Sequence, residues 1–191
     1  MKRHTVYCCL ILLLVCGEAF AFIIEVPGDA PTIQAGIDLS SDGDTVLVQP
    51  GTYLETIDFH GHSILLGSLF IIAGDTSYIN QTVIDGSYGD SSAVSFQNGE
   101  TESAICSGFT ICNGQLSGIY CQNSSPLLEN LQICYSSGNY LGGGIRMLNA
   151  SPLLRSLYLH HNNAQLGGAI YCSNSTPLME NLVIAQNQGY D

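Results

Sequence analysis

Hydrophobic residues recur along the second half of the chain in clusters of three to five, separated by turn-forming Gly, Asn, Ser and Pro. No stretch of about ten residues there shows the 3.6-residue period of an amphipathic helix. Short apolar clusters bounded by turn residues are typical of short strands. The pattern therefore predicts an all-β chain of short strands and tight corners.

The clusters belong to a repeated unit. Its proline recurs as Pro126, Pro152 and Pro177, which gives periods of 26 and 25 residues, and a weaker copy lies upstream at residues 93–113. A unit of this length holds three short strands and three corners, with each strand pairing in parallel with its equivalent in the next unit. The repeat predicts a solenoid of about 25 residues per coil over residues 44–191.

Equivalent residues of successive coils stack at about 4.8 Å, so the alignment predicts columns of side chains. The apolar columns expected in the core are Ile119/Ile145/Ile170, Cys121/Met147/Cys172, Leu128/Leu154/Met179 and Ile133/Leu159/Ile184. The amide columns expected at corners are Asn123/Asn149/Asn174 and Asn130/Ser156/Asn181. Several of these asparagines also form Asn-x-Ser/Thr sequons, but recurrence at one coil position favours a ladder that satisfies turn backbone.

The sequences GGGI at 142–145 and GGAI at 167–170, followed by LHHN at 159–162 and IAQN at 184–187, resemble a known repeat. They are similar to the GGA(I) and (F/I/L)xxN pairs of polymorphic outer-membrane and other bacterial surface proteins. The resemblance implies a right-handed parallel β-helix. The resemblance of these motifs specifies the fold but gives little information about the function.

The N-terminal segment predicts a cap for the solenoid. Residues 22–26 read as a strand, and residues 31–39 as a short amphipathic helix with Ile33 and Ile37 on one face. The order PTIQAGI then GDTVLVQPGTYLE resembles the capping helix and first coil of the superfamily that includes pectinesterases. A cap over residues 22–43 is physically required, because the first coil otherwise exposes its core and an unpaired strand edge.

Residues 1–21 predict a secretory signal peptide. Basic residues precede an apolar run, and Ala19-Phe20-Ala21 forms a small-residue cleavage site. A membrane anchor needs about 20 apolar residues, more than this run provides. The protein is therefore expected to be secreted or displayed at the cell surface, with no transmembrane segment after cleavage.

Charge narrows the classes of partner. Only 10% of the residues are charged and the formal net charge is −12, so nucleic acid is excluded as a partner because phosphate binding requires a basic face. The only arginines after residue 21 are Arg146 and Arg155, and no lysine remains. The repeat places Arg155 in a column with Glu129 and Glu180. It places Arg146 in a second column, where the guanidinium stacks on the rings of Tyr120 and Tyr171.

The five cysteines after residue 21 are irregularly spaced and do not indicate a disulfide framework. Cys112 and Cys134 align in neighbouring coils, so only this pair is close enough for a bridge. Cys121 and Cys172 lie two coils apart, beyond bridging distance.

The histidines and acidic residues give weak metal signals. His60 and His62 share strand parity with Asp58, without an evident third ligand. His160 and His161 are adjacent, so a regular strand would point them apart and prevent bidentate binding. No cofactor is predicted, and calcium at the cap carboxylates Asp29, Asp38, Asp42 and Asp44 is the one alternative, without a spacing signature.

The superfamily resemblance makes a carbohydrate-active enzyme the hypothesis to test. The pectinesterase motifs QDT and DFIFG are absent, as is the Asp-Asp pair of polygalacturonases, and both arginines have a structural place. The sequence predicts no catalytic residue and no metal ligand, and favours a non-catalytic β-helix scaffold, stalk or adhesin-like segment. Carbohydrate or other surface proteins are the partners expected.

Two alternatives remain. In the first, the chain is a fragment of a polysaccharide-processing lyase or esterase whose catalytic residues lie beyond it. In the second, the last coil associates with another molecule, because it has no polar cap. Residues 44–191 are accordingly expected to be a solenoid truncated at its C-terminus.

Overall fold

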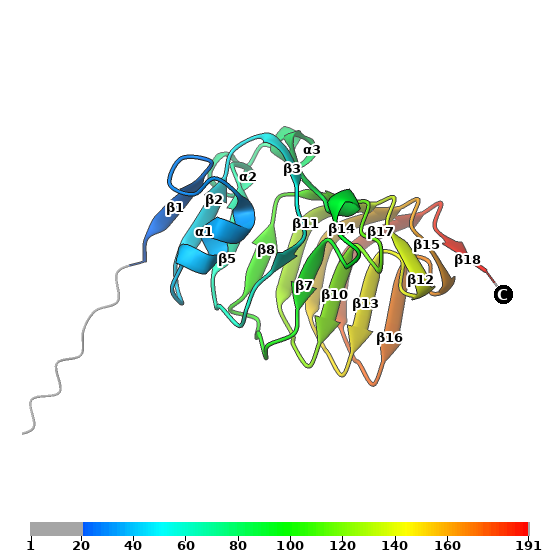
Figure 1. Ribbon diagram of the computed structural model, residues 1–191. Coiled ribbons are helices and arrows are strands. Elements are labelled where there is room, and N and C mark those ends of the chain that lie inside the picture. Colours follow the sequence, from blue (N-terminus) through cyan, green and yellow to red (C-terminus); the bar gives the residue numbers. More distant parts are fainter. Residues whose placement is uncertain (1–20, 191) are drawn as a thin grey trace, which may run out of the picture.

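The computed structural model describes residues 21–190, so the predicted signal peptide lies outside the described residues apart from Ala21. Strands dominate this range, and every strand pair in it is parallel. The strands form three sheets (Figure 1). This confirms the predicted mostly-β, parallel architecture.

The largest sheet has ten strands and is called sheet A here. It contains β1 (Ile23–Val26), β2 (Thr45–Val48), β3 (Gly51–Leu54), β5 (Leu65–Ser68), β6 (Thr82–Asp85), β8 (Ile105–Ser107), β9 (Thr110–Cys112), β11 (Leu127–Cys134), β14 (Leu153–His160) and β17 (Leu178–Ala185). Sheet B contains β4 (Ile57–Asp58), β7 (Val94–Phe96), β10 (Ile119–Gln122), β13 (Ile145–Leu148) and β16 (Ile170–Ser173). Sheet C contains β12 (Ser137–Leu141), β15 (Asn163–Leu166) and β18 (Gln188–Gly189).

The pairing register follows the sequence repeat. Ile119 pairs with Ile145, and Ile145 pairs with Ile170. In sheet A, Leu128 pairs with Leu154, which pairs with Met179. Each residue therefore meets its equivalent 25 or 26 positions later, and the chain passes through sheets A, C and B in turn before returning.

Left-handed backbone conformation marks the bends of the repeat. Positive φ angles of 48° to 56° occur in three aligned columns of non-glycine residues. One column ends each strand of sheet B, one lies in the middle of each long strand of sheet A, and one follows those strands. Their members are Asn123/Asn149/Asn174, Asn130/Ser156/Asn181 and Tyr135/His161/Gln186. Asparagine tolerates this conformation better than most residues, which explains why two of the columns appear as asparagine columns in the sequence.

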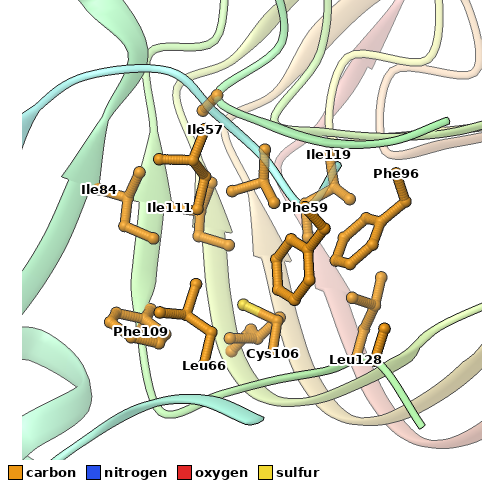
Figure 2. Close-up of a cluster of buried hydrophobic side chains, with 14 of the residues drawn as sticks. Ile57, Phe59, Leu66, Ile84, Phe96, Cys106, Phe109, Ile111, Ile119 and Leu128 are labelled. Atoms are coloured by element: carbon orange, nitrogen blue, oxygen red, sulfur yellow. The ribbon is translucent and has the colours of Figure 1, made fainter. Parts of the chain in front are cut away.

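Apolar side chains from the sheets fill the interior. Figure 2 shows part of this core, in which the rings of Phe59 and Phe96 lie side by side with centroids 4.2 Å apart. Fully burying one such side chain contributes about 1.5–3 kcal/mol. Leu154 and Leu159 are fully buried, whereas their equivalents Met179 and Ile184 in the last described repeat are 44% and 52% exposed.

Helix α1 (Ile33–Leu39) covers the first repeat with Ile33, Gly36 and Ile37 as its buried residues. Thr32 caps it through its side chain, which accepts a hydrogen bond from the Ala35 amide. The carboxylate of Glu55 accepts two more from the amides of Ile33 and Gln34 at 2.9 and 3.0 Å. The helix is only seven residues long, so these bonds and tertiary burial, rather than propensity, hold it in place.

The second repeat contains an insertion that the sequence pattern did not predict. Helices α2 (Phe70–Ala73) and α3 (Ser77–Gln81) lie between β5 and β6, and a 3₁₀ turn, η1 (Gly86–Tyr88), follows β6. Both helices lie against sheet A, where α2 contacts β5 and α3 contacts β6, β9 and β11 (Figure 1). Each is too short for a clear 3.6-residue period, which is why the pattern missed them.

A buried amide ladder connects the last repeats. The Asn162 side chain is fully buried and accepts a hydrogen bond from the Ser136 amide at 3.0 Å. Its Nδ2 donates to the Ile133 carbonyl and to Asn187 Oδ1, both at 2.9 Å. Asn187 Nδ2 in turn donates to the Leu159 carbonyl at 2.8 Å. These are the asparagines of the LHHN and IAQN motifs, and they satisfy the corner backbone.

We expect Asn162→Ala to lower the free energy of unfolding by about 3 kcal/mol, because it leaves buried backbone groups without partners. Urea denaturation measures the loss. Asn139→Ala, at an exposed position on β12, is the matched control and should change stability by less than about 0.5 kcal/mol. Equal effects of the two substitutions would contradict a structural role for the ladder.

Candidate functional site

A groove runs across sheet A beside α3. It has a volume of about 300 Å³, and we call it the α3 groove. Its walls are Thr76, Ile79, Asn80, Asn130, Leu131, Gln132, Ser156, Leu157, Tyr158, Asn181 and Val183. None of these side chains is charged. The groove therefore offers amides, hydroxyls and one aromatic ring over an apolar floor, on a chain whose net charge is strongly negative.

The inserted helices create this groove. One wall comes from α3, whose Ile79 carbonyl accepts a hydrogen bond from the Thr110 hydroxyl at 2.9 Å. The floor comes from β11, β14 and β17, which run side by side in register. The left-handed residue in the middle of each strand places its polar side chain at the surface, so equivalent polar groups line up along the groove.

Some of the polar groups in the groove are already paired and others are free. Asn181 donates to the Ser156 hydroxyl at 3.1 Å, and Asn130 donates weakly to Ser107 at 3.5 Å. Within residues 21–190, the Tyr158 hydroxyl makes no hydrogen bond to protein atoms, whereas the Gln132 side chain is hydrogen-bonded to the Cys134 thiol. Tyr158 is 38% exposed. The Tyr158 side chain is therefore available to a ligand.

A second hollow, of about 570 Å³, lies at the corner between sheets B and A. Its hydroxyl groups are already engaged, because Ser151 Oγ and Ser125 Oγ accept hydrogen bonds from the backbone amides of Thr176 and Ser151, and Ser151 Oγ is hydrogen-bonded to Thr176 Oγ1 at 3.0 Å. The Glu100 carboxylate is buried there and accepts bonds from the Gly61 amide at 2.9 Å and the Ser124 hydroxyl at 2.7 Å. The Glu100 and Ser151 side chains at this corner are therefore engaged in internal hydrogen bonds. No sequence pattern marks Glu100, whose carboxylate joins neighbouring corners.

The predicted asparagine column lies at this corner. Asn149 Nδ2 donates to Asn123 Oδ1, and Asn174 Nδ2 donates to Asn149 Oδ1, each at 3.3 Å. The amides are exposed and hydrogen-bond to one another, so the expectation that this column satisfies turn backbone is wrong. The buried ladder of Asn162 and Asn187 has that role.

Both arginines lie in columns. Arg155 Nε is 3.0 Å from Glu180 Oε2, and Arg155 Nη1 is 3.5 Å from Glu129 Oε2. The arginine therefore separates two like charges on the outer face of sheet A, an exposed arrangement worth at most about 1 kcal/mol.

The guanidinium carbon of Arg146 lies 5.1 Å from the centre of the Tyr120 ring. Tyr171 pairs with Arg146 in backbone register, and the stacking contact is with Tyr120. Neither arginine lines the α3 groove.

The cap carboxylates act as hydrogen-bond acceptors. Asp44 accepts from the amides of Phe22 and Ser41, both at 2.8 Å, and these bonds lower the pKa of its carboxyl. Asp42 accepts from the Ser63 amide at 2.8 Å, and Asp29 accepts from a nearby amide in the same way. Within residues 21–190 no three His, Cys, Asp or Glu side chains are placed to hold a metal ion.

The histidines differ from expectation. His60 lies in a turn with φ of 51°, and its Nδ1 is 3.3 Å from Asp38 Oδ1 rather than beside His62. The expectation that His160 and His161 point apart is wrong, because their Nδ1 atoms are 2.8 Å apart. The left-handed conformation of His161 breaks the alternation of a regular strand.

The five described cysteines are free thiols. Cys112 and Cys134 are register partners, as the repeat predicts. Burial, with the nearby Asp85 carboxylate and Cys134, raises the pKa of the Cys112 thiol to about 12. Burial also raises the pKa values of Cys106 and Cys121, so these thiols are unreactive at neutral pH.

We expect Asn149→Leu to destabilise the protein by about 1 kcal/mol, because Asn149 has a φ of 50° that disfavours a residue with a bulky side chain. Asn149→Gly removes the same amide but suits the backbone, so it should retain near-wild-type stability. Urea denaturation of both variants separates the two effects. If both lose the same free energy, the amide contacts rather than the conformation determine the column.

Comparison of the chain with protein-family models, curated proteins and solved structures finds no match in any of the three. In the part of the chain that the structure describes, no helix combines the length and apolar character needed to cross a membrane.

Proposed function

We propose that this protein is a secreted or surface-displayed, non-catalytic scaffold built as a right-handed parallel β-helix, an adhesin-like stalk that binds a neutral carbohydrate chain in the α3 groove. The observation that carries the proposal is an uncharged groove along the stacked strands that presents the partly exposed Tyr158 ring and its hydroxyl. The apolar run and small-residue site in residues 1–21 support export.

The chemistry of the groove suits a sugar. Ligand sites combine apolar surface with a few well-placed polar groups that fix orientation. Tyr158 offers an apolar ring face and a polar tip, and Gln132 offers both a donor and acceptors. The Asn130, Ser156 and Asn181 column continues these contacts across successive strands, which suits a chain-like ligand lying along the stack.

Charge selects between classes of carbohydrate. The chain has a net charge of −12, and its arginines at 146 and 155 lie in columns away from the groove. A polyuronate would be repelled by this field and would find no cation in the groove. A neutral glycan is not repelled by the negative charge of the chain and does not require a cation in the groove.

Binding is tested by calorimetric titration with neutral oligosaccharides, such as glucan, mannan and xylan fragments, alongside polygalacturonate and alginate. We expect a neutral oligosaccharide to bind and Tyr158→Ala to weaken its binding at least about tenfold, or about 1.4 kcal/mol. Tyr140→Ala is the matched control, since Tyr140 is an exposed tyrosine on β12 outside the groove. Unchanged binding in Tyr158→Ala, or a preference for the polyanions, would remove the α3 groove from the proposal.

We expect the protein to be inactive on pectin, pectate and alginate, with or without added calcium. Cleavage or de-esterification of these polymers requires a cation that stabilises the developing charge. Arg155 is paired with two glutamates, and Arg146 stacks on Tyr120. Turnover that Arg146→Ala or Arg155→Ala abolishes without unfolding the protein would establish an enzyme instead of a scaffold.

A further inference from the structure

A smaller hollow lies where the chain passes from sheet A to sheet C. It has a volume of about 190 Å³, and we call it the corner hollow. Aromatic and amide side chains line it, and no Asp, Glu, Lys or Arg is among them. Its walls are Tyr135, His161, Asn162, Asn163, Gln186 and Gln188. The α3 groove has the same character, so one class of ligand suits both.

A single histidine ring separates the corner hollow from the α3 groove. The Tyr158 ring, which lines the groove, packs on His160 with centroids 4.4 Å apart. The Tyr135 ring, which lines the corner hollow, meets the same His160 ring edge to face at 5.8 Å. The centres of the two tyrosine rings therefore lie about 10 Å or less from each other. His160 is 8% exposed, so it supports the tyrosines rather than contacting a ligand.

The left-handed bends after the strands of sheet A fix the rings of the corner hollow. Tyr135, His161 and Gln186 occupy equivalent positions with φ of 52°, 54° and 56°. Equivalent residues of successive repeats lie side by side, and the Tyr135 ring stacks on His161 with centroids 5.1 Å apart and 24° between the planes. His161 Nδ1 is also hydrogen-bonded to His160 Nδ1 at 2.8 Å. Because these rings are held before a ligand arrives, binding costs less conformational entropy.

The corner hollow has polar groups that the fold does not use. Within residues 21–190, the Tyr135 hydroxyl and the Gln186 amide make no hydrogen bond to protein atoms. Tyr135 is 58% exposed, and Gln186 is also exposed. Gln188, in contrast, accepts a hydrogen bond from the Tyr190 hydroxyl at 2.9 Å. An accessible ring face beside a free hydroxyl and a free amide provides the apolar contact and the few hydrogen bonds that a sugar unit requires.

The repeats around the corner hollow carry no net charge. Residues 103–190 contain two acidic side chains and two arginines, so their formal charges cancel. All other acidic side chains of the described residues precede residue 103. The corner hollow therefore lies in the neutral half of an acidic protein, which favours an uncharged ligand.

The relative position of the two hollows defines the shape of the ligand. The polar column of the groove, Asn130/Ser156/Asn181, runs across the strands and along the stack of repeats. The corner hollow lies to one side of this line, because Tyr135 follows the strand in which Asn130 is a middle residue. A linear chain that lies along the stack contacts the groove alone. A short branch on that chain, directed along the strands, reaches the corner hollow.

We propose that the protein binds a branched neutral glycan, with the main chain in the α3 groove and the branch in the corner hollow. The inference rests on the proposed function of the groove and adds to it a preference for branched over linear chains. Tyr158 contacts the main chain near the branch point. Tyr135 packs against the branch sugar, and the Gln186 amide hydrogen-bonds to its hydroxyl groups.

Calorimetric titration with matched linear and branched oligosaccharides of equal main-chain length tests this preference. The pairs are glucan with xyloglucan, mannan with galactomannan, and xylan with arabinoxylan fragments. For the main chain that binds, we expect the branched member to bind at least about tenfold more tightly than the linear one.

Two substitutions separate the corner hollow from the groove. Tyr135→Asn removes the ring and Gln186→Gly removes the amide, and both new residues tolerate the left-handed backbone. Each should reduce the advantage of the branched member and leave the affinity for the linear member unchanged. Tyr158→Ala should weaken the binding of both members. Tyr140→Ala is the matched control, because Tyr140 is exposed on β12 and lines neither hollow, and it should change neither affinity.

Thermal unfolding checks that each variant is folded, and the titrations then distinguish two kinds of failure. Equal affinities for linear and branched members, or an advantage that survives both Tyr135→Asn and Gln186→Gly, would overturn the role of the corner hollow while leaving the groove as a binding site. If no linear or branched neutral oligosaccharide binds, the proposed function of the groove fails and this inference fails with it.

Discussion

Parallel hydrogen bonding between successive repeats is the constraint on which this structure depends. Because each strand pairs with the strand one repeat later, every bend must recur at the same place in every repeat. A residue that turns the backbone through the left-handed region is therefore followed 25 or 26 positions later by another that does the same, as at Asn123, Asn149 and Asn174. Where the bend falls in the middle of a strand, as at Ser156, it separates two short pairing segments that would otherwise form one straight strand.

The same constraint controls the polar groups that the interior must accommodate. Each sharp corner turns backbone amides and carbonyls away from the sheet ladders, and leaving such groups buried without partners costs about 1–3 kcal/mol each. The fold satisfies them with a few polar side chains. Asn162 and Asn187 serve the corner after sheet A, and Glu100 joins the corners near Gly61 and Ser124. A chain with few charged residues thus uses its buried polar side chains to connect neighbouring repeats.

The surface features of interest arise where the regular repeat is modified. The α3 groove exists because an insertion in the second repeat places a short helix beside the strands of later repeats. The histidine pair exists because a left-handed bend in the fifth repeat falls on His161, directly after His160. In both places the stacked strands provide a rigid support, and the local departure from regularity provides the chemistry. The two features share one side chain, since Tyr158 lines the groove and packs on His160.

The sequence by itself determined the period, the parallel pairing and the identity of the stacked columns, because register is fixed when equivalent apolar residues must face one core. It also determined that Arg155 lies between Glu129 and Glu180, since pairing in register places these residues side by side. Only the tertiary structure decided where the polar groups point. Strand parity placed His160 and His161 on opposite faces, but one left-handed residue reversed that result, and φ at a single position leaves no periodic signal. The α3 groove was likewise invisible in the sequence, because its two walls are separated by about two repeats and meet only when the coils stack.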